Sequence, residues 1–375
     1  MTRIKIMLVC LGMLCCLMMT ANAEMRIAAV EIEDAGGKVS YPRLDGHPDA
    51  MVQAAVNQAI LDNCGVADLV QRVKNPFEKI EADYKAAVKG DVLSVVVSAK
   101  TNREQFYKTV TVDLRNGSEI TLESLFKDYT GAVSQMETIC IDRVEPNVSS
   151  YLENGEVLPL PLDAFYLSEK GITLYYPYKQ FSYFSGCSAD VEFLYYELKE
   201  YLDLSEGGVI DRLGGCDYMS PGEDTAKRIR EDAARGCLPG IVPKLSDELS
   251  PWLDKYRLLC DPDYYPGGRF FQTEAGEMRD IWLLTDSLTD GYDESRVLGI
   301  RADRINLYGI QPHVTTVEDV RQLLGQPETV VILDDYTAAD YYLPEGESHY
   351  YPMGDNTLRM HYDKEGSLVS VQLLD

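Results

Sequence analysis

The segment that decides the fold class is IEADYKAAVKGDVLSVVVSAK, residues 80–100. In its first half, apolar residues from Ile80 to Val88 alternate with mostly charged residues, which is the period-two pattern of a half-buried strand. Lys89-Gly90-Asp91 is a turn sequence, and the second half is rich in valine, whose branched side chain favours strands. The segment therefore predicts an antiparallel β-hairpin.

The flanking sequence extends this hairpin into an antiparallel sheet with packed helices. Asn116-Gly117 forms a tight turn after the next predicted strand, and Pro146 ends a predicted helix. These patterns predict an α+β fold for the first domain. The predicted strands are 106–114, 164–168, 172–176 and 191–194, and the predicted helices are 49–63 and 131–144.

A run of glycine and proline residues divides the chain, because such residues interrupt regular structure. We therefore predict a domain at 24–204, a linker with a short helix at 205–246, and a small α+β domain at 247–375. In the last domain Thr315-Thr316-Val317-Glu318 reads as a capping box that begins a helix. The other predicted elements there are a helix near 251–259 and strands at 269–272, 278–284, 329–333, 358–362 and 368–373.

The first 23 residues have the pattern of a cleavable secretory signal peptide. Arg3 and Lys5 precede an uncharged apolar run, and Ala21-Asn22-Ala23 is a small-x-small cleavage sequence. An uncleaved anchor and a lipoprotein are the alternatives, but the run is shorter than a spanning helix and Cys16 lacks the usual preceding triplet. We therefore expect an extracytoplasmic protein, periplasmic or secreted, with no membrane span after cleavage.

Charge and cysteine content agree with an exported protein. Loss of residues 1–23 would change the net charge from −26 to −28, which disfavours nucleic acid and anionic lipid as partners. Six cysteines would remain, an even number that indicates disulfides in an oxidising compartment. None forms a Cys-x-x-Cys pair, so no zinc or redox site is expected. The preferred pairings are Cys64 with Cys140, Cys187 with Cys216, and Cys237 with Cys260, and unpaired buried thiols are the alternative.

The first domain resembles one bacterial extracytoplasmic family, on segments that occur in a fixed order. These segments are Tyr41-Pro42-Arg43-Leu44, Val56-Asn57-Gln58-Ala59-Ile60, and residues 91–95, 111–126, 165–172 and 175–178 with Gly186. The family forms the outer part of the lysozyme-responsive anti-sigma factor RsiV and accompanies some peptidoglycan deacetylases. The resemblance covers residues 26–203, but Lys100 to Gln105 replace a Gly-Gly-x-His stretch and no "TFDDG" deacetylase motif is present. It implies an α+β fold and a binding role.

The C-terminal part resembles, more faintly, small modules of the SmpA/OmlA and β-lactamase-inhibitor-like type. The resemblance rests on TTVEDVRQLLGQP, residues 315–327, with Gly309-Ile310 and the terminal hairpin. Those modules bind proteins, so the resemblance implies protein binding.

Catalytic and metal-binding motifs are weak, and we predict no catalytic residue, metal or cofactor. Ser188 lacks the second glycine of a nucleophile elbow, and the loop 286–293 lacks two ligands of a calcium loop. A pair of carboxylates for glycoside hydrolysis is not visible in sequence, because only their separation in space identifies it. The four histidines, His47, His313, His349 and His361, have no metal-ligand spacing and read as structural or surface residues.

Tyrosine is the one enriched residue type, at 25 positions. Its ring and hydroxyl suit protein interfaces and sugar faces, although exposed strands also carry tyrosine. We predict a binding protein that recognises a basic muramidase such as lysozyme, or cell-wall glycan. The alternatives are an envelope assembly or inhibitory module and a cell-wall enzyme. The predicted binding residues are Tyr175, Tyr176, Tyr178 and Tyr183.

Overall fold

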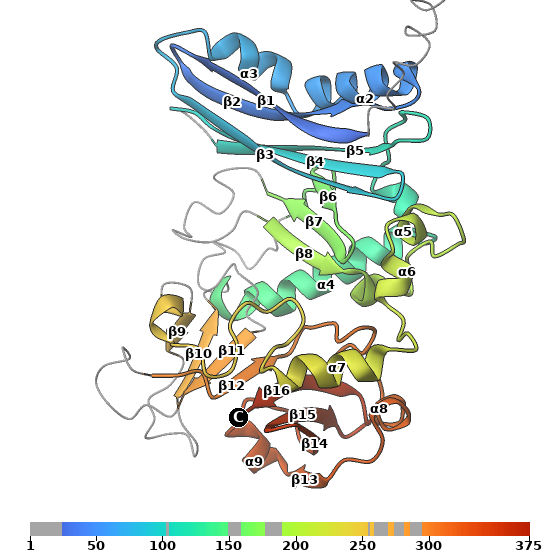
Figure 1. Ribbon diagram of the computed structural model, residues 1–375, viewed down its shortest axis with the longest axis vertical. Coiled ribbons are helices and arrows are strands. Elements are labelled where there is room, and N and C mark those ends of the chain that lie inside the picture. Colours follow the sequence, from blue (N-terminus) through green and yellow to red (C-terminus); the bar gives the residue numbers. More distant parts are fainter. Residues whose placement is uncertain are drawn as a thin grey trace, which may run out of the picture. The chain divides into compact units, whose positions relative to one another are not determined.

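The computed structural model describes residues 25–102, 105–148, 159–176, 190–253, 256–258, 269–273, 281–285 and 295–375. The protein has the expected α+β fold, in which helices accompany largely antiparallel sheets (Figure 1). Its contacts divide the chain into two compact units. The N-terminal unit holds the described residues up to Ser124, the segment Pro161–Ser168 and the described part of Leu174–Tyr178, and the C-terminal unit holds the rest. The predicted domain boundaries stay a prediction.

The N-terminal unit is built on a five-stranded sheet of order β1-β2-β3-β4-β5. The predicted hairpin is confirmed, since Lys89 pairs with Val92 and the strands continue to Glu81 and Lys100. Only β2 and β3 are parallel neighbours. The strands are β1 (Arg26–Asp34), β2 (Gly37–Asp45), β3 (Ile80–Lys89), β4 (Val92–Lys100) and β5 (Gln105–Asp113).

Two helices, α2 (Ala50–Asn63) and α3 (Val66–Arg72), cover one face of this sheet (Figure 1). Asp49 caps α2 by accepting a hydrogen bond from the amide of Met51 at 2.8 Å, which confirms the predicted helix. The buried stripe of α2 is Val52, Val56 and Ile60, and it packs in one core with the valines of β4.

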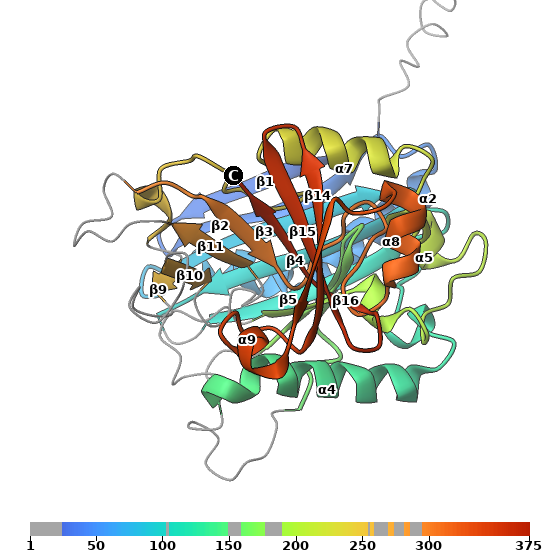
Figure 2. The ribbon, with the colours of Figure 1, turned by 90° about the horizontal axis from the view of Figure 1, so that it is seen from below.

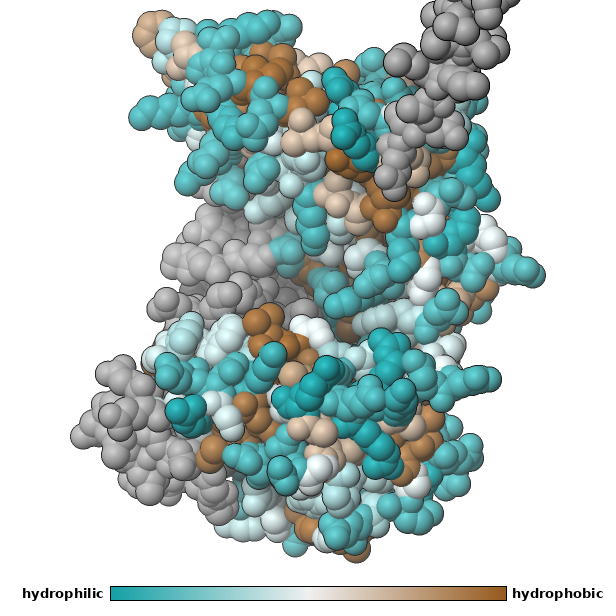
Figure 3. Space-filling view, in the orientation of Figure 1, coloured by the Kyte–Doolittle hydropathy of each residue, from teal (hydrophilic) through white to brown (hydrophobic). Residues whose placement is uncertain are grey.

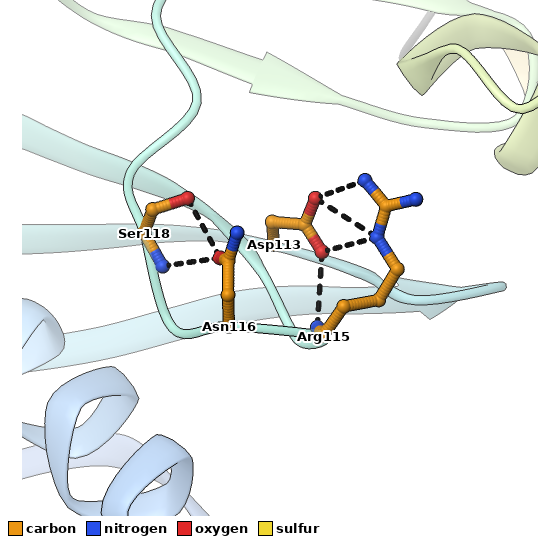
Figure 4. A network of polar contacts seen from close by, with 4 residues as sticks. All are labelled: Asp113, Arg115, Asn116 and Ser118. Carbon is orange, nitrogen blue, oxygen red and sulfur yellow. Dashed lines mark hydrogen bonds and ion pairs between the residues drawn. The ribbon is translucent and has the colours of Figure 1, made fainter.

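The turn after β5 forms as its sequence predicts. Gly117 has φ of +75°, which favours glycine, and the Asn116 side chain accepts hydrogen bonds from the Ser118 amide and hydroxyl at 2.9 and 2.7 Å (Figure 4). Asp113 accepts from the Arg115 amide and guanidinium in the same turn (Figure 4).

The middle of the chain confirms the second predicted hairpin and corrects one helix end. Strands β6 (Phe165–Leu167), β7 (Gly171–Tyr175) and β8 (Asp190–Leu194) form a sheet of that order. Helix α4 (Tyr129–Val148) runs through Pro146, so the predicted stop before that proline is wrong. Proline removes one amide donor, and here, in the last turn, the helix continues without it. Short 3-10 turns occupy η1 (Glu123–Leu125) and η2 (Tyr195–Leu198).

Residues of the predicted linker belong to the core of the C-terminal unit. Helices α5 (Val209–Arg212), α6 (Gly215–Tyr218) and α7 (Thr225–Ala234) lie in this segment. Ile229 and Ala233 of α7, with Leu238 and Leu245 after it, are buried in the same cluster as the sheet.

The C-terminal sheet is antiparallel throughout and has the order β13-β14-β15-β16-β12-β11-β10-β9. The predicted helix near 251–259 is wrong, because a 3-10 turn, η3 (Ser250–Trp252), and β9 lie there instead. Figure 2 shows β14, β15 and β16 side by side. The strands are β9 (Tyr256–Leu258), β10 (Arg269–Thr273), β11 (Ile281–Thr285), β12 (Gly299–Ala302), β13 (Thr329–Leu333), β14 (Gly346–Met353), β15 (Asn356–Asp363) and β16 (Leu368–Leu374).

One face of this sheet is apolar and is covered by α7 and by α8 (Val317–Leu324). The cap of α8 is Thr316 with Asp319, one residue later than predicted, because Thr315 is bonded to Gln311 instead. A further helix, α9 (Asp335–Ala339), joins β13 to β14. None of the described helices is long and apolar enough to cross a membrane.

Candidate functional site

Strand β13 lies at the edge of the C-terminal sheet. Among the residues that the structure describes, it pairs only with β14, in a register from Thr329 opposite Tyr350 to Leu333 opposite Gly346. In an edge strand, every second residue directs its amide and carbonyl away from the neighbouring strand. These groups can accept an additional strand from another chain.

Three of the five side chains of β13 are both exposed and apolar. Ile332 is 81% exposed, Val330 and Val331 are also exposed, and Tyr336 of α9 is 83% exposed just beyond the strand. Brown apolar patches interrupt the teal surface of the C-terminal unit at the end where β13 and α9 lie (Figure 3). We call Val330, Val331, Ile332 and Tyr336 the β13 edge. Natural edge strands are usually protected by lysine, proline or a bulge, and this one has none of these.

The β13 edge is surrounded by acidic residues. Residues 328–347 contain six aspartates and glutamates and no lysine or arginine. Glu345 pairs with Lys364, and Glu347 pairs with His349 and Arg321. The other four form no ion pair with any residue that the structure describes, and all four are exposed. They are Glu328, Asp334, Asp335 and Asp340.

Asp334 is the N-cap residue of α9, next to this surface. It caps α9 by accepting a hydrogen bond from the Thr337 amide at 2.8 Å, and this bond lowers the pKa of its carboxyl group. The cap begins α9 directly after β13, so Tyr336 is held on a short ordered helix next to the strand.

Two of the four tyrosines predicted to bind a partner are described by the structure, and both are buried. Tyr175 and Tyr176 are only 7% and 3% exposed. The Tyr175 ring stacks on Tyr107 at 5.0 Å and lies in a small core cluster with Tyr166. Tyr178 and Tyr183 lie outside the described residues. Their role as binding residues stays a prediction.

The histidines are held by hydrogen bonds at separate places in the fold. His47 contacts the Leu114 carbonyl at 3.0 Å, and His361 contacts the Pro344 carbonyl at 2.8 Å. His349 contacts Glu347 at 2.9 Å, and His313 has φ of +64°. Within the described ranges, no three His, Cys, Asp or Glu side chains lie together as metal ligands. Ser188 and the loop 286–293 lie outside those ranges.

The structure contains no disulfide among the four described cysteines, which are Cys64, Cys140, Cys216 and Cys237. Cys64 and Cys140 are therefore not joined in it. Cys187 and Cys260 lie outside the described residues. All three predicted pairings stay predictions.

In the unpaired form that the structure contains, the Cys64 thiol is expected to resist alkylation in the folded protein and to react after unfolding. It is fully buried, and burial raises its pKa to about 12, so little reactive thiolate forms near neutral pH. Peptide mapping after N-ethylmaleimide treatment, with and without denaturant, measures this. If Cys64 reacted only after reduction as well as unfolding, it would be in a disulfide, and the thiol assignment would be wrong.

The sequence predicts strand β13 but does not predict its position at the edge of the sheet. The predicted strand 329–333 matches the observed bounds. A continuous apolar run usually indicates a strand buried on both faces, but four of the five residues of β13 are exposed. The acidic residues on both sides of residues 329–333 were the sequence feature that could have indicated an exposed strand.

Comparison with known proteins gives only distant likenesses. No protein family model matches the chain. A DUF4309 family protein from Bacillus subtilis is 12% identical over 40% of this chain and 95% of its own, with a TM-score of 0.24. A DUF3298 family protein from Pseudomonas aeruginosa is 10% identical over 48% of this chain and 94% of its own, with a TM-score of 0.33. These likenesses are too loose to support a function, and the resemblance to the RsiV-like family stays a prediction.

Proposed function

We propose that this chain is an extracytoplasmic binding protein that captures an extended, basic segment of another protein along the β13 edge. The observation that carries the proposal is an edge strand with exposed apolar side chains beside four carboxylates that have no ion-pair partner in the described part of the chain. The extracytoplasmic setting rests on the predicted signal peptide at residues 1–23.

Strand addition fits both the polar and the apolar features of this surface. Main-chain hydrogen bonds to β13 would hold the added segment, and its alternate side chains would contact the exposed ones. Covering Ile332 and its neighbours would remove apolar surface from water, which is worth about 25 cal/mol per Å². The affinity therefore does not depend on charge alone.

The charge of the surface selects the class of partner. With a net charge of −26, two copies of this chain repel each other, and the acidic residues around β13 add to that repulsion at the edge. A basic segment is attracted instead, which raises its association rate. The predicted basic muramidase would carry a charge opposite to that of this surface. A glycan would find only one aromatic ring to stack on among the residues of the β13 edge, that of Tyr336.

We expect Ile332→Lys to abolish this binding without destabilising the fold. Natural edge strands often carry lysine, which prevents another strand from pairing with them. Because the Ile332 side chain is 81% exposed, a lysine there would displace no packed neighbour. The probe is a labelled heptapeptide of alternating lysine and valine, and fluorescence anisotropy measures its affinity. The variant should bind at least tenfold more weakly.

Met51→Lys is the matched control, because Met51 is also 81% exposed but lies on α2 of the N-terminal unit. It adds the same charge to the chain and should leave binding unchanged. A peptide N-methylated at alternate residues should not bind, because it cannot form the ladder. Equal losses in both variants, or unchanged binding of the methylated peptide, would leave only non-specific charge attraction and contradict the proposal. Lysozyme and an equally basic unrelated protein, tested in the same assay, separate a muramidase partner from a general basic one.

A further inference from the structure

The face of the C-terminal sheet opposite α7 and α8 carries a row of polar and aromatic side chains. Five residues on five adjacent strands are direct register partners, so their side chains share this face. In sheet order from β11 to β14 they are Trp282, Arg301, Gln372, Arg359 and Tyr350. We call them the arginine row.

Arg301, the first guanidinium of the row, is neutralised. Asp303 accepts two hydrogen bonds from it, at 2.7 and 2.6 Å. The carbonyls of Tyr341 and Tyr342 accept from it at 2.6 and 3.0 Å, and the Trp282 ring lies 4.3 Å from it. The charge of Arg301 is therefore balanced by Asp303, and its guanidinium donors already form hydrogen bonds within the protein.

Arg359, the second guanidinium, has no carboxylate partner among the described residues. It is only 7% exposed. Its Nε donates to the Ser348 hydroxyl at 3.0 Å, and one Nη donates to the side-chain Oε1 of Gln372 at 3.3 Å. The second Nη makes no hydrogen bond there. The chain contains 61 acidic residues, and the described part of the fold brings none of them to this charge.

The orientation of Arg359 is fixed by a chain of hydrogen bonds. His361 Nε2 donates to the Pro344 carbonyl, so Nδ1 is the acceptor of the ring. The Ser348 hydroxyl donates to that Nδ1 at 2.9 Å and accepts from Arg359. The free edge of the guanidinium is thus held in one direction before any ligand arrives.

Two tyrosine rings flank this guanidinium. Tyr341 and Tyr350 lie 5.4 and 5.7 Å from it, and both rings are only half-buried. Cation–π contacts offset part of the cost of burying the charge, but a buried unpaired charge remains unfavourable. Burial lowers the pKa of Arg359, and nearby Arg301 also lowers it.

We propose that Arg359 is the anchor of an anion-binding site that takes the carboxylate group of a small ligand. A carboxylate would accept hydrogen bonds from the unused guanidinium donors, which present the planar fork that suits it. Tyr341 and Tyr350 would contact the apolar or ring part of the ligand. This site lies on one face of the sheet and includes none of the four residues of the β13 edge, although Tyr350 pairs with Thr329 of β13. It does not depend on the proposed function.

Thermal unfolding of the full chain in sodium acetate, benzoate or glucuronate, with sodium chloride at equal ionic strength as reference, tests the site. We expect at least one carboxylate to raise the Tm of the wild-type protein above the chloride value in a saturable way. In Arg359→Met this rise should disappear, and in Arg359→Lys, which keeps the charge but loses the fork, the apparent Kd should rise at least tenfold. Lys227→Met, which removes an exposed charge from α7, should respond like the wild type.

The Tm without ligand separates a binding role from a structural one. Arg359→Met removes an unpaired buried charge and keeps most of the volume, so its Tm should be unchanged or higher. A clear fall in that Tm would show that Arg359 serves to hold the fold, and it would overturn the proposal. No carboxylate response in the wild type, or an equal response in Arg359→Lys, would also overturn it.

Discussion

Arg304→Met is expected to lower the free energy of unfolding of the C-terminal unit by about 3–5 kcal/mol, the cost of removing one partner from a buried ion pair. The Arg304 side chain is 5% exposed, and its Nε and Nη donate to the two oxygens of Glu197 at 2.9 and 3.0 Å. The same Nη donates to the Glu192 carbonyl at 2.6 Å. Without Arg304, the Glu197 carboxyl group loses its ion-pair partner at a place where its side chain is only 13% exposed.

Urea unfolding followed by tryptophan fluorescence measures this effect. The two tryptophans of the chain, Trp252 and Trp282, both belong to the C-terminal unit and report on it. Lys227→Met is the matched control, since its pair with Glu231 on α7 of the same unit is exposed and should matter little. The double variant Arg304→Met, Glu197→Gln should recover part of the loss, because it also replaces the buried carboxyl group by a neutral amide. A small effect of Arg304→Met alone would show that water reaches the pair.

Local elements were predictable because the sequence carries their periodicity. The hairpin of β3 and β4 and the helix α2 follow from alternation, a turn and a capped apolar stripe. Strand β14 was missed, because GESHYYPM contains glycine, histidine and proline and has no apolar alternation. Strand β1 was missed because its residues are mostly exposed or half-buried on both faces.

The two proposed binding surfaces were not predictable, because each depends on the order of strands in the sheet. β13 becomes an edge only when β14 is its single neighbour. Arg359 faces Gln372 and Tyr350 only through the register of β14, β15 and β16. The burial of Tyr175 also depends on the arrangement of strands. Its ring contacts Tyr107, which is distant in sequence, and Tyr166, which lies on another strand.

The packing of β14 against β15 leads to a second prediction with a large effect, Gly346→Ala. A Cβ atom at Gly346 would lie 1.9 Å from the Tyr362 carbonyl oxygen, a distance that no side chain tolerates without movement of the backbone. Gly346 pairs with Asp363 of β15 and with Leu333 of β13, so this movement would disturb both neighbours of β14. We expect a loss of about 2 kcal/mol or more in the free energy of unfolding, the order expected for strained backbone sites.

The same variant tests whether the β13 edge depends on its attachment to β14. Because Gly346 ends the pairing with Leu333, we expect Gly346→Ala to weaken peptide binding at the β13 edge under conditions where the protein is still folded. Gly222→Ala is the control, since the nearest atom to its Cβ would be 3.6 Å away and both properties should stay unchanged. Urea unfolding and the anisotropy assay measure the two effects on one sample. Lower stability with unchanged peptide affinity would show that β13 keeps its geometry without this pairing, and the edge would then be defined by α9 and its Asp334 cap.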